Sequence, residues 1–138
     1  MMKKILVGYD LSPGSEKALN LAIELARDRD VELAILFVRS KYDRNFIKEN
    51  DLTEADIKER LKDMMKEAVK TVIRSDIKVE GVILKGDISR KIMDYSEEKD
   101  VDLVIIGATG IGDFGKYKLG SIAEKLAHYS TKPVLIVR

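Results

Sequence analysis

Short apolar runs rich in β-branched residues alternate along this chain with segments whose apolar residues recur every three or four positions. The runs predict five strands, and the periodic segments predict four helices between them. The expected strands cover residues 4–9, 31–39, 77–86, 101–107 and 133–138, and the expected helices cover about 13–28, 53–74, 88–100 and 121–130. Strands that carry several apolar residues in succession are typical of a parallel sheet covered on both faces. The sequence therefore predicts a doubly wound α/β fold.

The position of a ligand crevice follows from the expected strand order, 3-2-1-4-5. Sheets of this kind bind ligands beyond the carboxyl ends of the strands, where the winding reverses direction. Here the reversal lies between the first and the fourth strand, so Asp10 and Gly107 are expected side by side. The polar, aperiodic residues 40–52 are predicted to form a loop.

Composition excludes several classes of function. The 25 basic and 24 acidic residues leave a net charge of +1, which provides no global basic field for nucleic acid. Without cysteine, the chain has no disulfide, thiol nucleophile or thiolate metal site. No apolar run reaches the roughly 20 residues that span a bilayer, and no signal-peptide pattern is present. We expect a single cytoplasmic domain over residues 1–138, with no membrane partner.

The segment GATGIGDFGKYKLGS, residues 107–121, contains three overlapping phosphate-binding patterns. Gly110, Gly112 and Gly115 form G-x-G-x-x-G, which should open the helix after the first strand and precede an acidic residue about 20 positions later. Here the pattern follows the fourth strand, and residues 130–138 contain no acid. The dinucleotide interpretation is therefore rejected.

The second pattern, Gly110, Gly115 and Lys116, forms most of a Walker A loop. That loop needs a small hydroxyl directly after the lysine to hold Mg²⁺. Tyr117 carries its oxygen at the end of a ring, and Gly120 disfavours a helix that continues from the lysine. This pattern is also rejected.

The third pattern combines Gly107, Gly110, Gly120 and Ser121. Gly107 ends a strand where a base or ribose could approach bare backbone, and Gly110 permits a tight turn. Gly120-Ser121 opens the last helix, where free N–H groups and the helix dipole favour phosphate; Lys116 and Lys118 add positive charge. The alternative is a glycine-rich loop in which Ser121 is a plain helix cap. The residues alone do not decide between phosphate binding and this alternative.

Gly107-Ala-Thr-Gly110, nine further residues and then Gly120-Ser121 resemble the G-x2-G-x9-G-[ST] signature of the ATP-binding branch of the universal stress protein family. The resemblance spans the whole chain, through KILVGYDLSPGSEKAL, LAILFV, VDLVIIGATG and KPVLIVR. It implies an adenine-nucleotide α-hydrolase-like fold with ATP, and Mg²⁺ carried on its phosphates, as the ligand. In contrast to many relatives, this chain has Thr109 in place of histidine, Ile111 in place of a basic residue and Ile88 in place of proline.

The resemblance also implies roles for individual residues. It assigns Asp10 to the adenosine, Val38 to the adenine pocket and Gly107 to the ribose. The phosphates would be held by Gly110, Gly120, Ser121 and the backbone of Ile122, and the remaining expected lining residues are Gly8, Tyr9, Ile106 and Thr109.

Asp10 has two other interpretations. It could be a turn or capping residue ahead of Pro13, or the phosphoryl acceptor of a receiver domain. A receiver needs an early acidic pair and a lysine after its fifth strand, whereas Lys132 here precedes that strand. His128 is the sole histidine, so the sequence predicts no metal site and no catalytic residue.

The last strand, residues 133–138, carries four consecutive apolar residues at the expected edge of the sheet. Such an edge favours pairing with another chain, so we expect a homodimer built on it. The expected function is an ATP-binding stress-response protein that acts as a nucleotide-linked switch or sensor, with at most slow hydrolysis. The alternative is an ATP-dependent enzyme of the adenine-nucleotide α/β group with an unidentified small substrate, for which residues 40–52 are the available segment.

Overall fold

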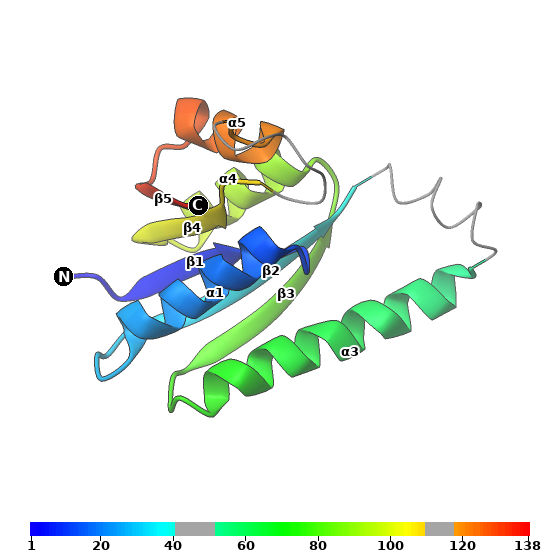
Figure 1. Ribbon diagram of the computed structural model, residues 1–138, viewed down its shortest axis with the longest axis horizontal. Helices are drawn as coiled ribbons and strands as arrows, with labels where there is room; N and C mark the ends of the chain where they lie inside the picture. The colour runs from blue at the N-terminus through cyan, green and yellow to red at the C-terminus, as the bar shows by residue number, and fades with distance from the viewer. Residues whose placement is uncertain (41–51, 110–117) are drawn as a thin grey trace.

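The computed structural model describes residues 1–40, 52–109 and 118–138, which form a parallel sheet with helices on both faces (Figure 1). The strands are β1 (Lys4–Gly8), β2 (Glu32–Arg39), β3 (Val79–Lys85), β4 (Leu103–Gly107) and β5 (Val134–Val137). The helices described are α1 (Pro13–Ala26), α3 (Glu54–Ile73), α4 (Ile88–Glu98) and α5 (Ser121–Tyr129). The predicted elements are confirmed, with ends that differ by a few residues.

The sheet order is β3-β2-β1-β4-β5, and every neighbouring pair is parallel. This order confirms the predicted 3-2-1-4-5 topology. β1 is the central strand, and its Val7 pairs with Ile35 of β2 and Ile105 of β4. The chain winds to one side through β2 and β3 and to the other through β4 and β5, so the reversal lies between β1 and β4.

Side-chain alternation along β1 divides the core into two layers. Ile5 and Val7 pack with α1 and α3 on one face of the sheet, whereas Leu6 packs with α4 and α5 on the other. Because successive side chains of a strand point to opposite faces, a strand buried on both sides must be apolar at every position. The continuous apolar runs that predicted the sheet have this cause.

Helix α1 begins where the sequence predicts. Ser12 is its N-cap and accepts a hydrogen bond from the backbone N–H of Ser15, and Pro13 occupies the first helical position. Gly14, in the first turn of α1, lies against the end of β4, so that a Cβ atom on it would lie 3.7 Å from the Cα of Gly107. The start of α1 therefore lies at the carboxyl edge of the sheet.

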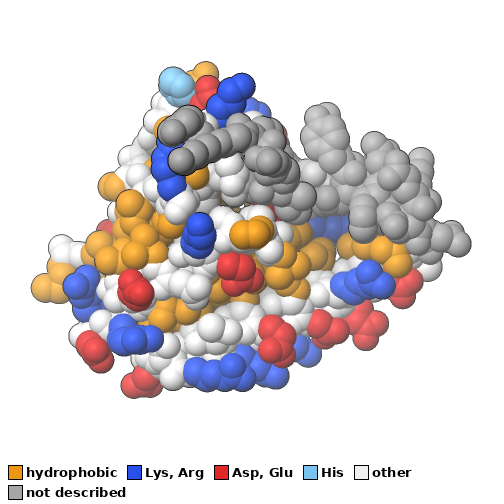
Figure 2. Space-filling model, in the orientation of Figure 1, with side chains coloured by type: hydrophobic (Ala, Val, Ile, Leu, Met, Phe, Trp, Pro, Cys, Tyr) orange, Lys and Arg blue, Asp and Glu red, His pale blue; other side chains and the backbone are white. Residues whose placement is uncertain are grey.

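The surface of the α1 and α3 face carries charges of both signs. Basic and acidic side chains are interspersed along the lower edge of the molecule, where α3 lies (Figure 2). None of the helices described is both long and apolar enough to cross a bilayer.

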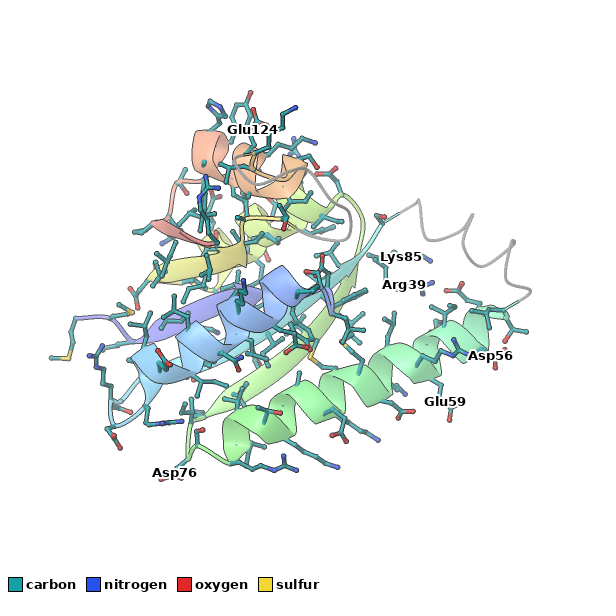
Figure 3. All side chains as sticks on the ribbon, in the orientation of Figure 1. Arg39, Asp56, Glu59, Asp76, Lys85 and Glu124 are labelled. Atoms are coloured by element: carbon teal, nitrogen blue, oxygen red, sulfur yellow. The ribbon has the colours of Figure 1, made fainter. Side chains whose placement is uncertain are left out.

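A buried arginine ties the end of β2 to the start of α3. The guanidinium of Arg39 forms a two-point ion pair with Glu54, at 2.6 and 3.3 Å, and Lys85 lies 3.9 Å from the same carboxylate. Arg39 and Lys85 extend from the ends of neighbouring strands on the same side of the molecule (Figure 3). Residues 41–51, within the predicted loop, lie outside the described residues.

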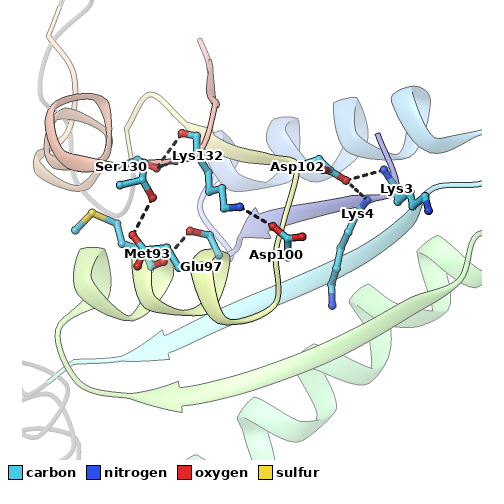
Figure 4. Close-up of polar contacts among 10 residues, drawn as sticks. Lys3, Lys4, Met93, Glu97, Asp100, Asp102, Ser130 and Lys132 are labelled. Atoms are coloured by element: carbon cyan, nitrogen blue, oxygen red, sulfur yellow. Dashed lines mark hydrogen bonds and ion pairs between the residues drawn. The ribbon is translucent and has the colours of Figure 1, made fainter. Parts of the chain in front are cut away.

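A second set of polar contacts lies where β1 and β4 begin (Figure 4). The carboxylate of Asp102 accepts hydrogen bonds from the backbone N–H groups of Lys3 and Lys4, at 2.7 and 3.0 Å. Lys132 pairs with Asp100 at 2.8 Å. These contacts fix the amino ends of the central strands, opposite the edge at which Asp10 and Gly107 lie.

Candidate functional site

A cavity of about 820 Å³ lies at the carboxyl edge of the sheet, between β1 and β4 and the helices that follow them. Ligand pockets commonly enclose about 300–1,000 Å³. All ten predicted site residues that the structure describes line it: Gly8, Tyr9, Asp10, Val38, Ile106, Gly107, Thr109, Gly120, Ser121 and Ile122. The eleventh, Gly110, lies outside the described residues. Segments almost a hundred residues apart therefore meet where the topology predicts a ligand.

The start of α5 differs from the starts of the other helices described. Side chains cap α1, α3 and α4, but α5 begins after Gly120 without any side-chain cap. The N–H of Gly120 donates to the carbonyl of Ala108, at 2.6 Å. The next three N–H groups belong to the first turn, where no earlier carbonyl of the helix can accept from them.

Ser121 is the first residue of α5, and the N-cap is Gly120. The alternative in which Ser121 serves as a plain helix cap is therefore wrong. A cap accepts from N–H groups of the first turn through its own side chain, and glycine has none. Within the described residues, the first turn of α5 borders the cavity without a side-chain cap.

Asp10 forms a tight turn between β1 and α1. Its Oδ1 accepts a hydrogen bond from the N–H of Ser12 at 2.9 Å, and its own N–H donates to the Ser15 hydroxyl at 3.2 Å. Leu11, between them, has a φ of 69°, which is uncommon for a residue with a branched side chain. Asp10 is thus a turn residue, as one interpretation expected, and its half-buried side chain also lines the cavity.

Tyr9 lines the cavity, but its side chain belongs mainly to the core. Its ring packs into the α1 and α3 core, and its hydroxyl donates a hydrogen bond to Glu16. Burial, that hydrogen bond and the nearby charges of Glu16 and Asp10 all raise the pKa of the Tyr9 phenol. The ring therefore stays neutral and holds the β1 end against α1.

Gly107 is in close contact with α1. A Cβ atom on Gly107 would lie 2.6 Å from the carbonyl carbon of Gly14, and a Cβ on Gly14 would lie 2.3 Å from the carbonyl oxygen of Thr109. Both distances are far inside van der Waals contact. The lack of a side chain at Gly107 is thus required by helix packing, a reason that the sequence alone did not indicate.

Several cavity residues were not predicted from the sequence as site residues. They are Ser12, Ser15, Leu36, Phe37, Ser40, Gly86, Asp87, Ile88, Ile92, Ala108, Ala123 and Lys125. The sequence could have indicated Gly86 and Asp87, because they directly follow β3, which also ends at the carboxyl edge of the sheet. For Lys125 the signal is helical spacing, since it lies four residues after Ser121 on the same face of α5.

Asp87 is the N-cap of α4. Its Oδ2 accepts hydrogen bonds from the N–H of Arg90 at 3.0 Å and from the hydroxyl of Ser89 at 3.1 Å. These two bonds, with smaller effects from the charges of Lys125 and Arg90, lower the pKa of the Asp87 carboxyl below its ordinary value. An ionised carboxylate therefore borders the cavity beside β3.

The two ends of the cavity offer different chemistry. The end at α5 presents first-turn N–H groups, the positive end of the helix dipole and Lys125, which together favour an anion. The end at β2 and β3 presents Val38, Ile88 and Ile92, which favour an apolar ring. No group of three or more His, Cys, Asp or Glu side chains that could hold a metal occurs within residues 1–40, 52–109 and 118–138.

Comparison with known proteins gives consistent results. The sequence model described as the universal stress protein family matches residues 1–138. Universal stress protein YxiE of Bacillus subtilis is 30% identical over 148 aligned residues, and the alignment covers 100% of both chains.

Solved structures share the fold. The structure of protein MJ0577, which is a universal stress protein of Methanocaldococcus jannaschii, has a TM-score of 0.87 at 29% identity and covers 99% of this chain and 96% of that one. A universal stress protein of Archaeoglobus fulgidus, solved in complex with dAMP, has a TM-score of 0.72 at 22% identity over 100% of this chain and 98% of that one. The predicted resemblance is thus confirmed, and the chain belongs to the universal stress protein family.

Proposed function

We propose that this protein binds an adenine nucleotide, ATP with Mg²⁺, and acts as a nucleotide-linked switch or sensor in a cytoplasmic stress response. The observation that carries the proposal is the uncapped first turn of α5, which opens into a cavity of nucleotide size beside Gly120 and Ser121. Backbone N–H groups at such a helix start bind phosphate well. The Archaeoglobus relative with the same fold was solved with dAMP, an adenine nucleotide.

The lining suggests how the nucleotide lies. The phosphates occupy the α5 end, where Lys125 adds positive charge, and the ribose lies near Asp10. The base extends toward Val38, beyond the end of β2. Mg²⁺ arrives on the phosphates and neutralises part of their charge.

A switch fits the described residues better than an enzyme with a second substrate. The charged side chains among the described cavity-lining residues are Asp10, Asp87 and Lys125, and hydrogen bonds already hold Asp10 and Asp87 in turn and cap roles. We therefore propose hydrolysis that is slow at most. Multiple turnovers that depend on an added co-substrate would instead support the ATP-dependent enzyme.

The proposal is tested by thermal unfolding of the purified protein with Mg-ATP, AMP and GTP. A ligand at 100 times its dissociation constant adds about 2.7 kcal/mol to the free energy of unfolding, which raises the midpoint of a chain of this length by several degrees. An ATP-selective rise is expected. Acid extraction of the sample checks for nucleotide that co-purified; an empty protein that shows no rise refutes the proposal.

Two substitutions at one position isolate the backbone contribution. Ser121→Pro removes the N–H at the first helical position, where proline is well tolerated, and Gly120 already has the extended backbone that precedes proline. Ser121→Ala removes the hydroxyl and keeps the N–H. We expect Ser121→Pro to lower the ATP affinity about tenfold, the size of one charge-assisted hydrogen bond, beyond any effect of Ser121→Ala. Equal affinities in the two variants would contradict this arrangement.

We also propose a homodimer through residues 133–138. β5 is an edge strand whose four residues, Val134–Val137, are all partly exposed, so its outer backbone groups and apolar side chains can pair with a second copy. Sedimentation equilibrium at tens of micromolar should give twice the mass of one chain. A monomer at that concentration would overturn the dimer but not the nucleotide site.

A further inference from the structure

The carboxylate of Asp87 has one oxygen in use and one available. Both of its hydrogen bonds go to Oδ2, from Arg90 and Ser89, and within the described residues nothing donates to Oδ1. Asp87 is exposed and lines the cavity. An ionised carboxylate accepts hydrogen bonds and cannot donate them. The cavity wall beside β3 therefore carries an acceptor that the cap leaves unused.

The position of Asp87 in the sheet determines which part of a ligand it meets. β3 and β4 are three strand spacings apart, about 14 Å. With the phosphates at the start of α5, which follows β4, Asp87 lies at the far end of the cavity. Its neighbours there, Val38, Ile88 and Ile92, are apolar and suit the faces of a purine ring. Among the described residues, the Asp87 carboxylate is a charged group at this apolar end, which Ser40 also lines.

We propose that Asp87 selects the base of the nucleotide, by accepting a hydrogen bond at Oδ1 from the 6-amino group of adenine. This assignment rests on the proposed nucleotide function and adds a specificity-determining residue to it. A purine with a 6-oxo group would present a carbonyl oxygen to the same carboxylate, and two acceptors repel each other. The contact therefore favours adenine over a 6-oxo purine such as hypoxanthine.

Asp87→Asn reverses the polarity of this contact and preserves the cap. Asparagine is as good an N-cap as aspartate, and its single oxygen is needed for the N–H of Arg90 and the hydroxyl of Ser89. The amide NH₂ then occupies the position of Oδ1, so an acceptor becomes a donor. Asp56→Asn is the matched control, because it makes the same change in the capping box of α3, outside the cavity lining.

The experiment measures dissociation constants of the wild type and both variants for three ligands: ATP, ITP and purine riboside triphosphate, which lacks the 6-amino group. The wild type should bind ATP about tenfold more tightly than either analogue, as expected for one hydrogen bond to a charged group. Asp87→Asn should lose about tenfold for ATP, change little for purine riboside triphosphate and gain for ITP. Asp56→Asn should match the wild type.

The outcomes separate the two proposals. If the wild type binds ATP and Asp87→Asn keeps the wild-type ratios among the three ligands, the role of Asp87 is overturned and the nucleotide site stands. If Asp87→Asn weakens all three ligands equally, Asp87 acts through the position of α4, and the base contact is again overturned. A wild type that binds none of the three refutes the nucleotide function and this assignment with it. Unchanged thermal midpoints would establish that the variants fold.

Discussion

Gly107→Ala tests the close packing between β4 and α1 on which the site depends. The added Cβ would lie 2.6 Å from the carbonyl carbon of Gly14, 2.7 Å from its oxygen and 3.0 Å from its Cα. Ordinary contact begins at 3.4 Å, so strand and helix must separate by about 0.8 Å. All three atoms are backbone, and no side-chain rotation relieves the clash. Overpacking of this kind costs about 1–3 kcal/mol.

The stability of Gly107→Ala can be measured by urea and thermal unfolding. For a chain of this length, a loss of 1 kcal/mol lowers the thermal midpoint by about 3 °C. The expected decrease is therefore about 3–9 °C. The nucleotide affinity should fall as well, because displacement of Gly14 shifts the adjacent Ser15, whose hydroxyl accepts from the N–H of Asp10.

Gly8→Ala is the matched control for stability. Its Cβ would approach the side-chain termini of Ile106 and Ile92 at 3.4 and 3.5 Å, which is ordinary contact with groups that can move. Its stability should lie within about 1 kcal/mol of the wild type, since alanine also restricts the unfolded chain. If Gly107→Ala unfolds at the same temperature as Gly8→Ala, the close contact with Gly14 is not the reason for glycine at this position.

Two further predictions concern capping and pH. Ser12→Ala removes the side-chain acceptor for the Ser15 N–H and should cost about 1 kcal/mol in urea unfolding; a Ser12→Asn variant should recover most of it, and equal losses in both would contradict the capping role. The backbone N–H groups of Lys3 and Lys4 lower the pKa of the Asp102 carboxyl below its ordinary value of 3.8. Because the folded pKa is the lower one, this stabilisation is present above pH 3.8 and is lost as the pH falls through the folded pKa. Asp102→Asn should therefore flatten the acid limb of a stability-against-pH curve, and an unchanged limb would contradict the assignment.

The sequence predicted a doubly wound sheet because the central strands carry several apolar residues in succession. Each of Ile5, Leu6 and Val7 is buried, and each faces a different layer from its neighbour in the chain. Such a run needs helices on both faces, and short connections leave few ways to wind them. The edge at which Asp10 and Gly107 meet followed from that winding.

Site details that depend on side-chain direction were harder to predict. Tyr9 and Asp10 were expected in the site together, but alternation along β1 turns the Tyr9 ring into the α1 and α3 core with Ile5 and Val7. Because side chains along a strand alternate between its two faces, counting every second residue from Ile5 could have shown that Tyr9 points into this core. The contact between Gly107 and Gly14 could not be identified in the same way, because it depends on the distance between a helix and a strand that are far apart in the chain.

The sequence did not indicate Asp87 as a cavity residue, because a role as helix cap is sufficient to explain an aspartate at this position. An Asp followed by Ile-Ser-Arg at the start of a helix is typical of an N-cap, and the structure confirms that role. A cap, however, uses one oxygen of a carboxylate that has two. Whether the second oxygen faces solvent or a cavity depends on the neighbouring β2 and on α5, which sequence order alone does not place beside it.

The contrast among helix starts connects the fold to the proposed function. Ser12 and Asp87 cap α1 and α4 with their own side chains, and both helices begin at the same edge of the sheet as α5. Gly120 gives α5 an N-cap that costs only a few tenths of a kcal/mol relative to a polar cap, yet within the described residues no side chain caps the first turn. A helix that needed only to be stable would gain from serine, aspartate or asparagine at this position. In the proposed function, the phosphates of the nucleotide supply an acceptor for this turn at the cavity.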